Sequence, residues 1–519
     1  MPKQSTDHLI NLVKRMTPAE KRHFKIFVKR NNPKEDPIFL KLFDYIDRKK
    51  TYNEDLIIRE IKGIKKTQLA NVKANLLKQL LSSLKLQMRN SLSDINIREQ
   101  VDFAQVLYAK GLYKGALGQL EKAKKAAAEK EKYSLLQTII EFEKHIESLY
   151  ITGSMYPKAK SLTKESNENI NKISIENKLT DFSLSLYGLY LQYGYVKNEE
   201  DFNFVTNYFK SKFPKVDESK LGFMGKLSLY QSYVWYYNMV QNFAYYYKYA
   251  QKWLDHFLEH PYWIAEETSL FIKGYHNLLN GLFMCSRSEK FEKRLMELKN
   301  LEEDYNLNFL ENQRSSFRLF EINHDINNVY LSGNYESAQE MAINISQIII
   351  KNPYEWDDFR IMMFDYKVAC IYFGAADLDN CILHLNRITN VVRPHLRGDI
   401  QCFARILNII AHFDLGNEDL VSHQIRSTYR FISKMDNVQK VHREIFAFLR
   451  RTPSMTEGIL HQEFSKLKTK LVELKKDPYE RRPFLYLDII SWLDSKIEGV
   501  TMAEAVRKNA FFNGKIEKG

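Results

Sequence analysis

Residues 103–127, FAQVLYAKGLYKGALGQLEKAKKAA, contain two helical runs that meet at Gly111. Apolar side chains recur every three or four residues on both sides of this glycine, which places them on one face of each helix. Small residues, among them Ala116 and Ala123, fall where two antiparallel helices have to approach closely. The stretch therefore predicts a helical hairpin with its turn at Gly111.

The same pattern returns later in the chain. Residues 329–342, VYLSGNYESAQEMA, repeat the order of a glycine, a tyrosine two positions on and an alanine three positions further. The residues concerned are Gly111, Tyr113 and Ala116 in the first copy and Gly333, Tyr335 and Ala338 in the second. Turns are expected about every 41–47 residues, near Gly111, Gly153, Gly194, Gln241, Ser286, Gly333, Gly374 and Gly416. A period of this length is typical of a helical solenoid.

These two units resemble tetratricopeptide repeats. The resemblance is good in the two copies and poor near Gln241 and Ser286, where the turn glycine is missing. It implies an all-α solenoid of stacked helical hairpins, with a concave surface that binds other proteins. It implies no particular ligand.

Composition agrees with an all-α class. The 519 residues include only 19 glycines and 12 prolines, too few for the many tight turns of an all-β protein. We expect no membrane span and no signal peptide, because no apolar run is long enough for either. The four cysteines follow no zinc-like or disulfide spacing, so a cytoplasmic location is expected.

Positive charge is concentrated at the start of the chain. Residues 1–90 hold 21 Lys and Arg against 9 Asp and Glu, a net charge of +12, while the rest of the chain holds 56 against 55. This asymmetry predicts a basic helical module over residues 1–92, a repeat solenoid over 93–452 and capping helices over 453–519.

The basic module offers candidate contacts to an acidic partner, either nucleic acid, a ribonucleoprotein or a protein surface. A helix should begin at Thr17-Pro18 with Glu20 as the capping-box partner, and a helix-turn-helix outline breaks at Gly63 and restarts near Thr67. The alternative is that these lysines only keep the surface of the module soluble and contact no partner. The candidate contact residues are Lys21, Arg22, Lys25, Lys29, Arg30, Lys65, Lys66, Gln68, Asn71, Lys73 and Lys78.

An aromatic stretch, residues 230–253, is the second candidate. Tyr233, Tyr237 and Tyr247 belong to a three-to-four-residue stripe that core packing between two helices explains. The remaining rings cannot share that face, and a partner-binding groove lined by some of them is the alternative. These surplus rings are Trp235, Tyr236, Tyr245, Tyr246 and Tyr249.

The sequence contains no motif for catalysis, for a cofactor or for a metal ion. Nucleotide-binding glycine loops, GxSxG and HExxH are all missing. His256 and His260 are four residues apart but lack the glutamate between them that zinc proteases use, and Glu259 stands at a different position. We therefore expect a non-enzymatic protein with no cofactor.

Two functions follow from these patterns. The first is a protein-binding adaptor or scaffold that uses the helical-repeat surface, with the basic module as a docking element. The alternative is a nucleic-acid-binding regulator whose repeats act as a sensor domain, an interpretation that rests on analogy between folds.

Overall fold

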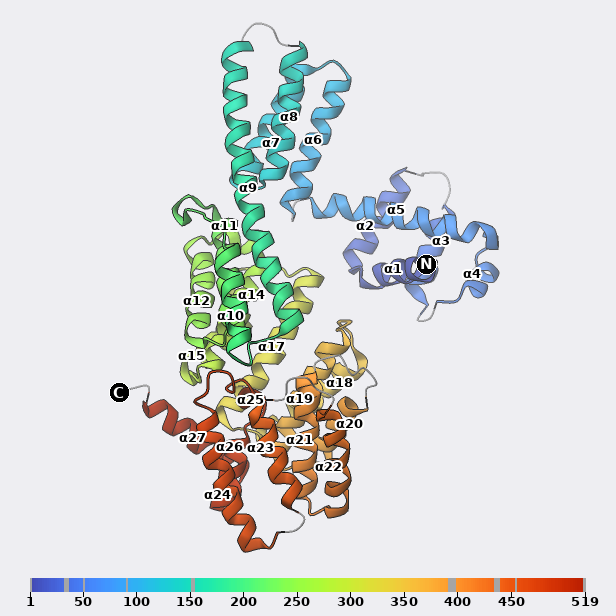
Figure 1. Cartoon of the computed structure of the whole chain (residues 1–519). Coiled ribbons are helices and arrows are strands. Elements are labelled where there is room, and N and C mark those ends of the chain that lie inside the picture. The colour runs from blue at the N-terminus through green and yellow to red at the C-terminus, as the bar shows by residue number, and fades with distance from the viewer. Residues whose placement is uncertain are drawn as a thin grey trace. The chain divides into compact units, whose positions relative to one another are not determined.

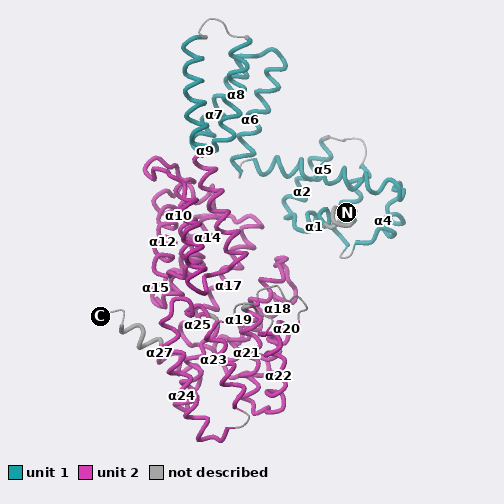
Figure 2. Tube along the Cα trace, viewed as in Figure 1, with its two compact units in different colours: residues 1–174 teal, residues 175–519 magenta. Residues whose placement is uncertain are grey.

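The computed structural model describes residues 2–31, 37–49, 52–89, 92–150, 155–390, 398–433, 439–452 and 455–516, and all regular secondary structure in them is helical. These residues form 27 α-helices and no β-strand, so the predicted all-α class is confirmed (Figure 1). The chain divides into two compact units, residues 1–174 and 175–519, and the boundary falls inside helix α9 (Figure 2).

Unit 1 contains the basic segment and the first predicted hairpin. Its helices are α1 (Pro2–Arg15), α2 (Pro18–Asn31), α3 (Ile38–Arg48), α4 (Glu54–Glu60), the short 3-10 helix η1 (Lys66–Gln68), α5 (Leu69–Met88), α6 (Ser93–Ala109), α7 (Tyr113–Glu129), α8 (Tyr133–Tyr150) and the first half of α9 (Met155–Tyr193).

Unit 2 continues from α9 to the end of the chain. Its helices are α10 (Glu199–Lys212), η2 (Glu218–Lys220), α11 (Phe223–Met239), α12 (Phe243–Glu259), α13 (Tyr262–Glu266), α14 (Thr268–Met284), α15 (Ser288–Lys299), α16 (Leu301–Asp304), α17 (Glu311–Ser332), η3 (Glu336–Ala338), α18 (Gln339–Lys351), α19 (Asp358–Gly374), α20 (Leu378–Thr389), α21 (Gly398–Asp414), α22 (Glu418–Ile432), α23 (Lys440–Arg451), α24 (Glu457–Leu474), α25 (Pro483–Tyr486), α26 (Ile489–Glu498) and α27 (Met502–Ile516).

In the described residues, the same backbone turn closes six tight helical pairs, and it recurs at Asn306 between α16 and α17. One residue has a positive φ, and the N–H of the next residue donates to the carbonyl five positions earlier at 2.8–3.0 Å. This bond satisfies a carbonyl that the end of the first helix would otherwise leave unpaired. The left-handed residues are Gly111, Glu131, Gln241, Ser286, Ala376 and Gly416, which close α6–α7, α7–α8, α11–α12, α14–α15, α19–α20 and α21–α22.

Four of the predicted turn positions, Gly111, Gln241, Ser286 and Gly416, fall on these left-handed residues. Gly374 ends α19, and the positive φ lies two residues later at Ala376. Glu131 closes a pair that the repeat spacing did not include. Gly194 and Gly333 also have positive φ, while Gly153 lies outside the described residues.

The first helices of successive pairs pack on one another along unit 2. Helix α14 contacts α17, α17 contacts α19, α19 contacts α21, and α21 contacts α23 (Figure 1). The alanines of both repeat copies, Ala116 and Ala338, are buried as a close helix–helix approach requires. Tyr335 is buried, whereas Tyr113 is half-buried and packs its ring against Tyr108.

The C-terminal helices do more than cap the last pair. Helix α27 packs back on α17, where Ala503 and Val506 contact the turn at Gly333. The segment before α25 reaches further back, because Arg482 donates to the side-chain oxygen of Asn238 at 2.8 Å. Residues near both ends of unit 2 are therefore in direct contact, which a simple open stack would not bring about.

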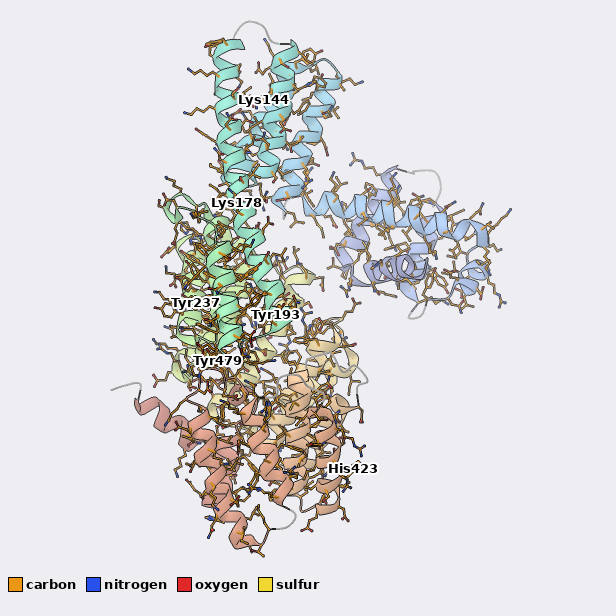
Figure 3. The ribbon with its side chains drawn as sticks, viewed as in Figure 1. Lys144, Lys178, Tyr193, Tyr237, His423 and Tyr479 are labelled. Atoms are coloured by element: carbon orange, nitrogen blue, oxygen red, sulfur yellow. The ribbon has the colours of Figure 1, made fainter. Side chains whose placement is uncertain are left out.

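A second bridge joins the same two regions. The Tyr195 hydroxyl donates to the side chain of Gln439 at 3.2 Å, and Gln439 donates in turn to the carbonyl of Tyr479 at 2.9 Å. Tyr479 also packs against the apolar cluster formed by α9, α10 and α11 (Figure 3). Because these hydrogen bonds are buried or half-buried, they fix the C-terminal segment against the start of unit 2.

The ring of Tyr335 packs directly on Gly374 of the following helical pair. A Cβ atom at Gly374 would lie 2.4 Å from the ring of Tyr335, which is buried and cannot move aside. Gly374→Ala should therefore lower the free energy of unfolding by about 1–3 kcal/mol through overpacking. Chemical denaturation followed by circular dichroism measures this change.

The matched control is Gly188→Ala in the same unit. Gly188 lies inside α9 with no neighbouring atom within 4 Å of its added Cβ, so alanine should stabilise this helix by up to about 1 kcal/mol. Equal effects of the two substitutions would contradict the packing described for Tyr335.

Candidate functional site

Four tyrosines form a stacked group on the α11–α12 pair, which we call the tyrosine ladder: Tyr233 and Tyr237 from α11, Tyr245 and Tyr249 from α12. Residues four apart on a helix share a face, and the turn at Gln241 brings the two faces together. The rings of Tyr233 and Tyr249 stack at 4.2 Å and those of Tyr237 and Tyr245 at 5.0 Å. Tyr237 is labelled in Figure 3.

The ladder combines an apolar ring surface with neutral hydroxyl groups. Burial raises the pKa of Tyr237 and of Tyr249 to about 12, so both phenols keep their protons at neutral pH. Tyr245 is 45% exposed. Two exposed lysines lie over the outer rings, with the Lys248 ammonium 5.4 Å from the centre of Tyr245 and the Lys252 ammonium 5.6 Å from that of Tyr249.

The rings predicted to line a groove are divided among four environments. Tyr245 and Tyr249 belong to the ladder, but Tyr246 is buried and donates to Asn277 at 3.0 Å, so it cannot line a groove. The Tyr236 ring packs in a tilted arrangement on Phe209, 4.1 Å between ring centres, between α10 and α11.

Trp235 lies apart from the ladder, against α9. Its ring packs 4.6 Å from Tyr187 and 5.5 Å from Tyr190. The periodicity had assigned Tyr233 and Tyr237 to the core, yet they are only half-buried and complete the ladder. Their spacing mirrors that of Tyr245 and Tyr249 across the turn at Gln241, and this mirror relation was the signal available in the sequence.

The basic segment of unit 1 folds around α5, which packs on α1, α2 and α3. The predicted capping box is present, since the Thr17 N–H donates to Glu20 at 2.7 Å and the Glu20 N–H to the Thr17 hydroxyl at 3.2 Å. Gly63 has a φ of +101° and separates α4 from η1 and α5, in the order that the helix-turn-helix outline predicts.

Three of the predicted contact lysines are held by ion pairs within the unit. Lys21 pairs with Asp47 at 2.7 Å. Lys25 pairs with Asp44 at 2.8 Å. Lys73 pairs with Glu54 at 2.6 Å and lowers the pKa of that carboxyl, mainly through their hydrogen bond. The other predicted side chains are exposed, namely Arg22, Lys29, Arg30, Lys65, Lys66, Gln68, Asn71 and Lys78.

Three helices of unit 2 bring together a serine, a histidine and an aspartate that sequence spacing could not reveal. The Ser346 hydroxyl lies 3.0 Å from His384 Nε2, and His384 Nδ1 donates to Asp365 at 2.7 Å. Asp365 also accepts from Arg387 at 3.3 Å. These distances match those of a nucleophile, a base and an orienting acid.

The surroundings of Ser346 favour a structural role for this network. Ser346 donates to the carbonyl of Ala342 at 2.7 Å, and Tyr372 forms a further hydrogen bond with the same serine. Because Ser346 lies inside α18, the neighbouring backbone N–H groups serve the helix and cannot form an oxyanion hole. The network therefore links α18, α19 and α20 without the donors that acyl transfer requires.

His256, Glu259 and His260 are the residues that could hold a metal ion in the described part of the chain. Their ligand atoms lie within 4.8 Å of one another. His256 Nε2 donates to the carbonyl of Phe223 at 3.2 Å, and His260 Nδ1 to the carbonyl of His256 at 3.0 Å, so each ring keeps one free nitrogen.

Burial, with a smaller effect from the positive charge of Lys226, lowers the pKa of His256 to about 4. The nearby lysine charge disfavours a cation at this cluster. We assign no metal to the cluster.

Comparisons with known proteins add no identification: no protein-family model, curated protein or solved structure matches this chain. In the described ranges, no helix is both long and apolar enough to cross a bilayer.

The serine network gives the second prediction. Ser346→Ala removes the partner of His384 Nε2 and should lower the free energy of unfolding by about 1–2 kcal/mol. Ser465→Ala is the control, because exposed Ser465 makes a similar bond to the carbonyl four residues earlier, and it should change stability by less than about 0.5 kcal/mol. Covalent labelling of Ser346 by a fluorophosphonate would contradict the structural role.

Proposed function

We propose that this chain is a non-catalytic, cytoplasmic adaptor whose helical pairs form a tetratricopeptide-like solenoid and whose tyrosine ladder binds a partner protein. The observation that carries the proposal is the ladder itself, four stacked and partly exposed tyrosines on one helical pair.

Tyrosines in such an arrangement suit protein recognition for a physical reason. Their rings supply a large contact area, and their side chains lose little conformational freedom on binding. Here the rings are already held against each other, so a partner would meet a preformed surface. Lys248 and Lys252 at the outer edge favour a partner segment with acidic residues next to its apolar ones.

A paired substitution tests the adaptor function. Tyr245→Ala with Tyr249→Ala should weaken partner binding by at least about tenfold, because central aromatic residues commonly contribute 2 kcal/mol or more to an interface. Affinity capture from nuclease-treated cytoplasm, quantified by mass spectrometry, would compare this variant with the wild-type chain. Tyr429→Ala is the control, since Tyr429 is 57% exposed on α22 of the same unit and lies outside the ladder.

The outcome is decided by the difference between the variants. Proteins recovered with the wild-type chain and with Tyr429→Ala, but lost with the ladder variant, support the proposal. Equal recovery with all three chains would show that the ladder is not the binding surface.

The second candidate is a nucleic-acid-binding regulator, and the exposed cations of unit 1 favour it. Lys65 and Lys66 lie at the turn before α5, and Lys29 and Arg30 at the end of α2. Phosphate contacts by such groups release counterions, which makes binding steeply dependent on salt.

Salt dependence distinguishes contacting lysines from those already paired. If the full chain binds duplex DNA or RNA, Lys65→Gln with Lys66→Gln should reduce the slope of log K against log salt by about 1–2. Lys73→Gln should leave the slope unchanged, because Glu54 already neutralises Lys73. Fluorescence anisotropy over a salt series measures both, and the absence of binding at low salt would rule this candidate out.

A further inference from the structure

Helix α5 of unit 1 carries apolar side chains on two opposite sides. The inner side is buried against α1, α2 and α3 and includes Leu76 and Leu80. On the outer side Ala74 and Leu81 are exposed and Leu77 is half-buried. Because residues three, four and seven apart share one side of a helix, these three form a stripe. Leu81 is 53% exposed, although leucine is usually buried in a folded protein.

A shallow hollow of about 460 Å³ lies along this stripe. Every described residue that lines it belongs to α5, and together they extend over about three helical turns. Volumes of this size accommodate side chains or small ligands. We call this surface the α5 face, and its residues are Ala74, Leu77, Lys78, Leu81, Ser82 and Lys85.

The charged groups of the α5 face are both lysines. Lys78 is exposed and has no ion pair with a described residue. Lys85 lies 3.7 Å from the carboxylate of Asp102 on α6, and both of these side chains are more than half exposed, so water weakens their attraction. No Asp or Glu lines the hollow among the described residues, and residues 1–90 carry a net charge of +12. The charge of the face therefore favours an acidic partner.

The combination of leucines and lysines distinguishes among the partners that could cover this face. A second copy of the chain in a symmetric dimer would bring the lysines of both copies together, which like-charge repulsion disfavours. Nucleic acid would pair its phosphates with the lysines but would leave the apolar stripe without a complementary surface. A helix with apolar residues on one side and carboxylates beside them complements both features, as in other grooves that receive amphipathic helices.

We propose that the α5 face docks an acidic amphipathic helix of a partner protein. Leu77 and Leu81 receive the apolar side chains of that helix, and Lys78 and Lys85 pair with its carboxylates. The α5 face belongs to unit 1 and the tyrosine ladder to unit 2, so either proposal can fail without the other.

Binding of a designed peptide to the full chain tests this docking. The probe is a fluorescent peptide of about 18 residues, with leucine at every third or fourth position and glutamate or alanine elsewhere. Fluorescence anisotropy should show saturable binding of the probe. A scrambled peptide of the same composition should bind at least about tenfold more weakly, because its leucines share no face.

A substitution in the stripe measures its contribution to binding. Leu81→Ala should weaken binding of the probe at least about tenfold, because it removes an apolar contact at the centre of the face. The variant should remain folded, since the Leu81 side chain is half exposed. Leu149→Ala is the matched control, because Leu149 is 57% exposed on α8 of the same unit and lies outside the face, and it should bind the probe like the wild-type chain.

Charge exchange gives a result that misfolding cannot imitate. Lys78→Glu with Lys85→Glu should lose the acidic probe and gain binding of a peptide in which lysine replaces each glutamate. Lys41→Glu changes an exposed lysine on α3, and this control should keep the preference for the acidic probe.

Four results would overturn the proposal. Two concern the stripe: the scrambled peptide binds as well as the probe, or Leu81→Ala binds the probe like the wild-type chain. A dimer in sedimentation velocity that Leu81→Asp dissociates would assign the face to a second copy. Binding of duplex DNA that the charge-exchanged chain loses, with no binding of the probe to the wild-type chain, would assign the face to nucleic acid.

Discussion

The fold depends on one backbone constraint, the left-handed residue that closes six of the helical pairs in the described residues. A single positive φ reverses the chain within two residues and lets an N–H reach the carbonyl five positions earlier. The two helices then lie antiparallel and in contact from the turn onward. Four of the six closing residues are not glycine, namely Glu131, Gln241, Ser286 and Ala376, although a side chain makes this conformation unfavourable by roughly 1–2 kcal/mol. The packing of the paired helices compensates for that unfavourable term.

Once the pairs are closed, contacts between successive pairs follow from residue size. Tyr335 lies against Gly374 of the next pair because a glycine leaves space for the ring. The same relation recurs where Gly274 receives the ring of Trp253. A large ring opposite a missing side chain fixes the register of neighbouring helices, and it explains why helical glycines are tolerated there despite their low helix propensity.

The polar groups between the helices of unit 2 differ in whether their charges are paired with complementary groups. In the Ser346–His384–Asp365 network every group has a partner of complementary character, so the network links three helices and is stable as it stands. Lys367, in contrast, donates to the neutral side chains of Asn323 and Asn327, and burial lowers its pKa to about 7.

The sequence by itself determined the all-α class, the helical pairs and most of their turns. Helical periodicity and the glycine–tyrosine–alanine spacing are local, and local geometry decides where a helix ends. It also identified the capping box at Thr17, because that motif spans a single turn. The division into units 1–174 and 175–519 depends on contacts that local patterns do not contain.

Tertiary structure alone decided which side chains share a surface. Helix periodicity shows which residues lie on one face, yet Tyr246 became buried and Tyr233 half-exposed because neighbouring pairs cover one side of α12 and leave part of α11 open. Lys73 lost its free charge to Glu54, which lies 19 residues away. The contact between Arg482 and Asn238 joins residues 244 positions apart. Charge pairing and closure depend on distance in space, and no spacing along the chain encodes that distance.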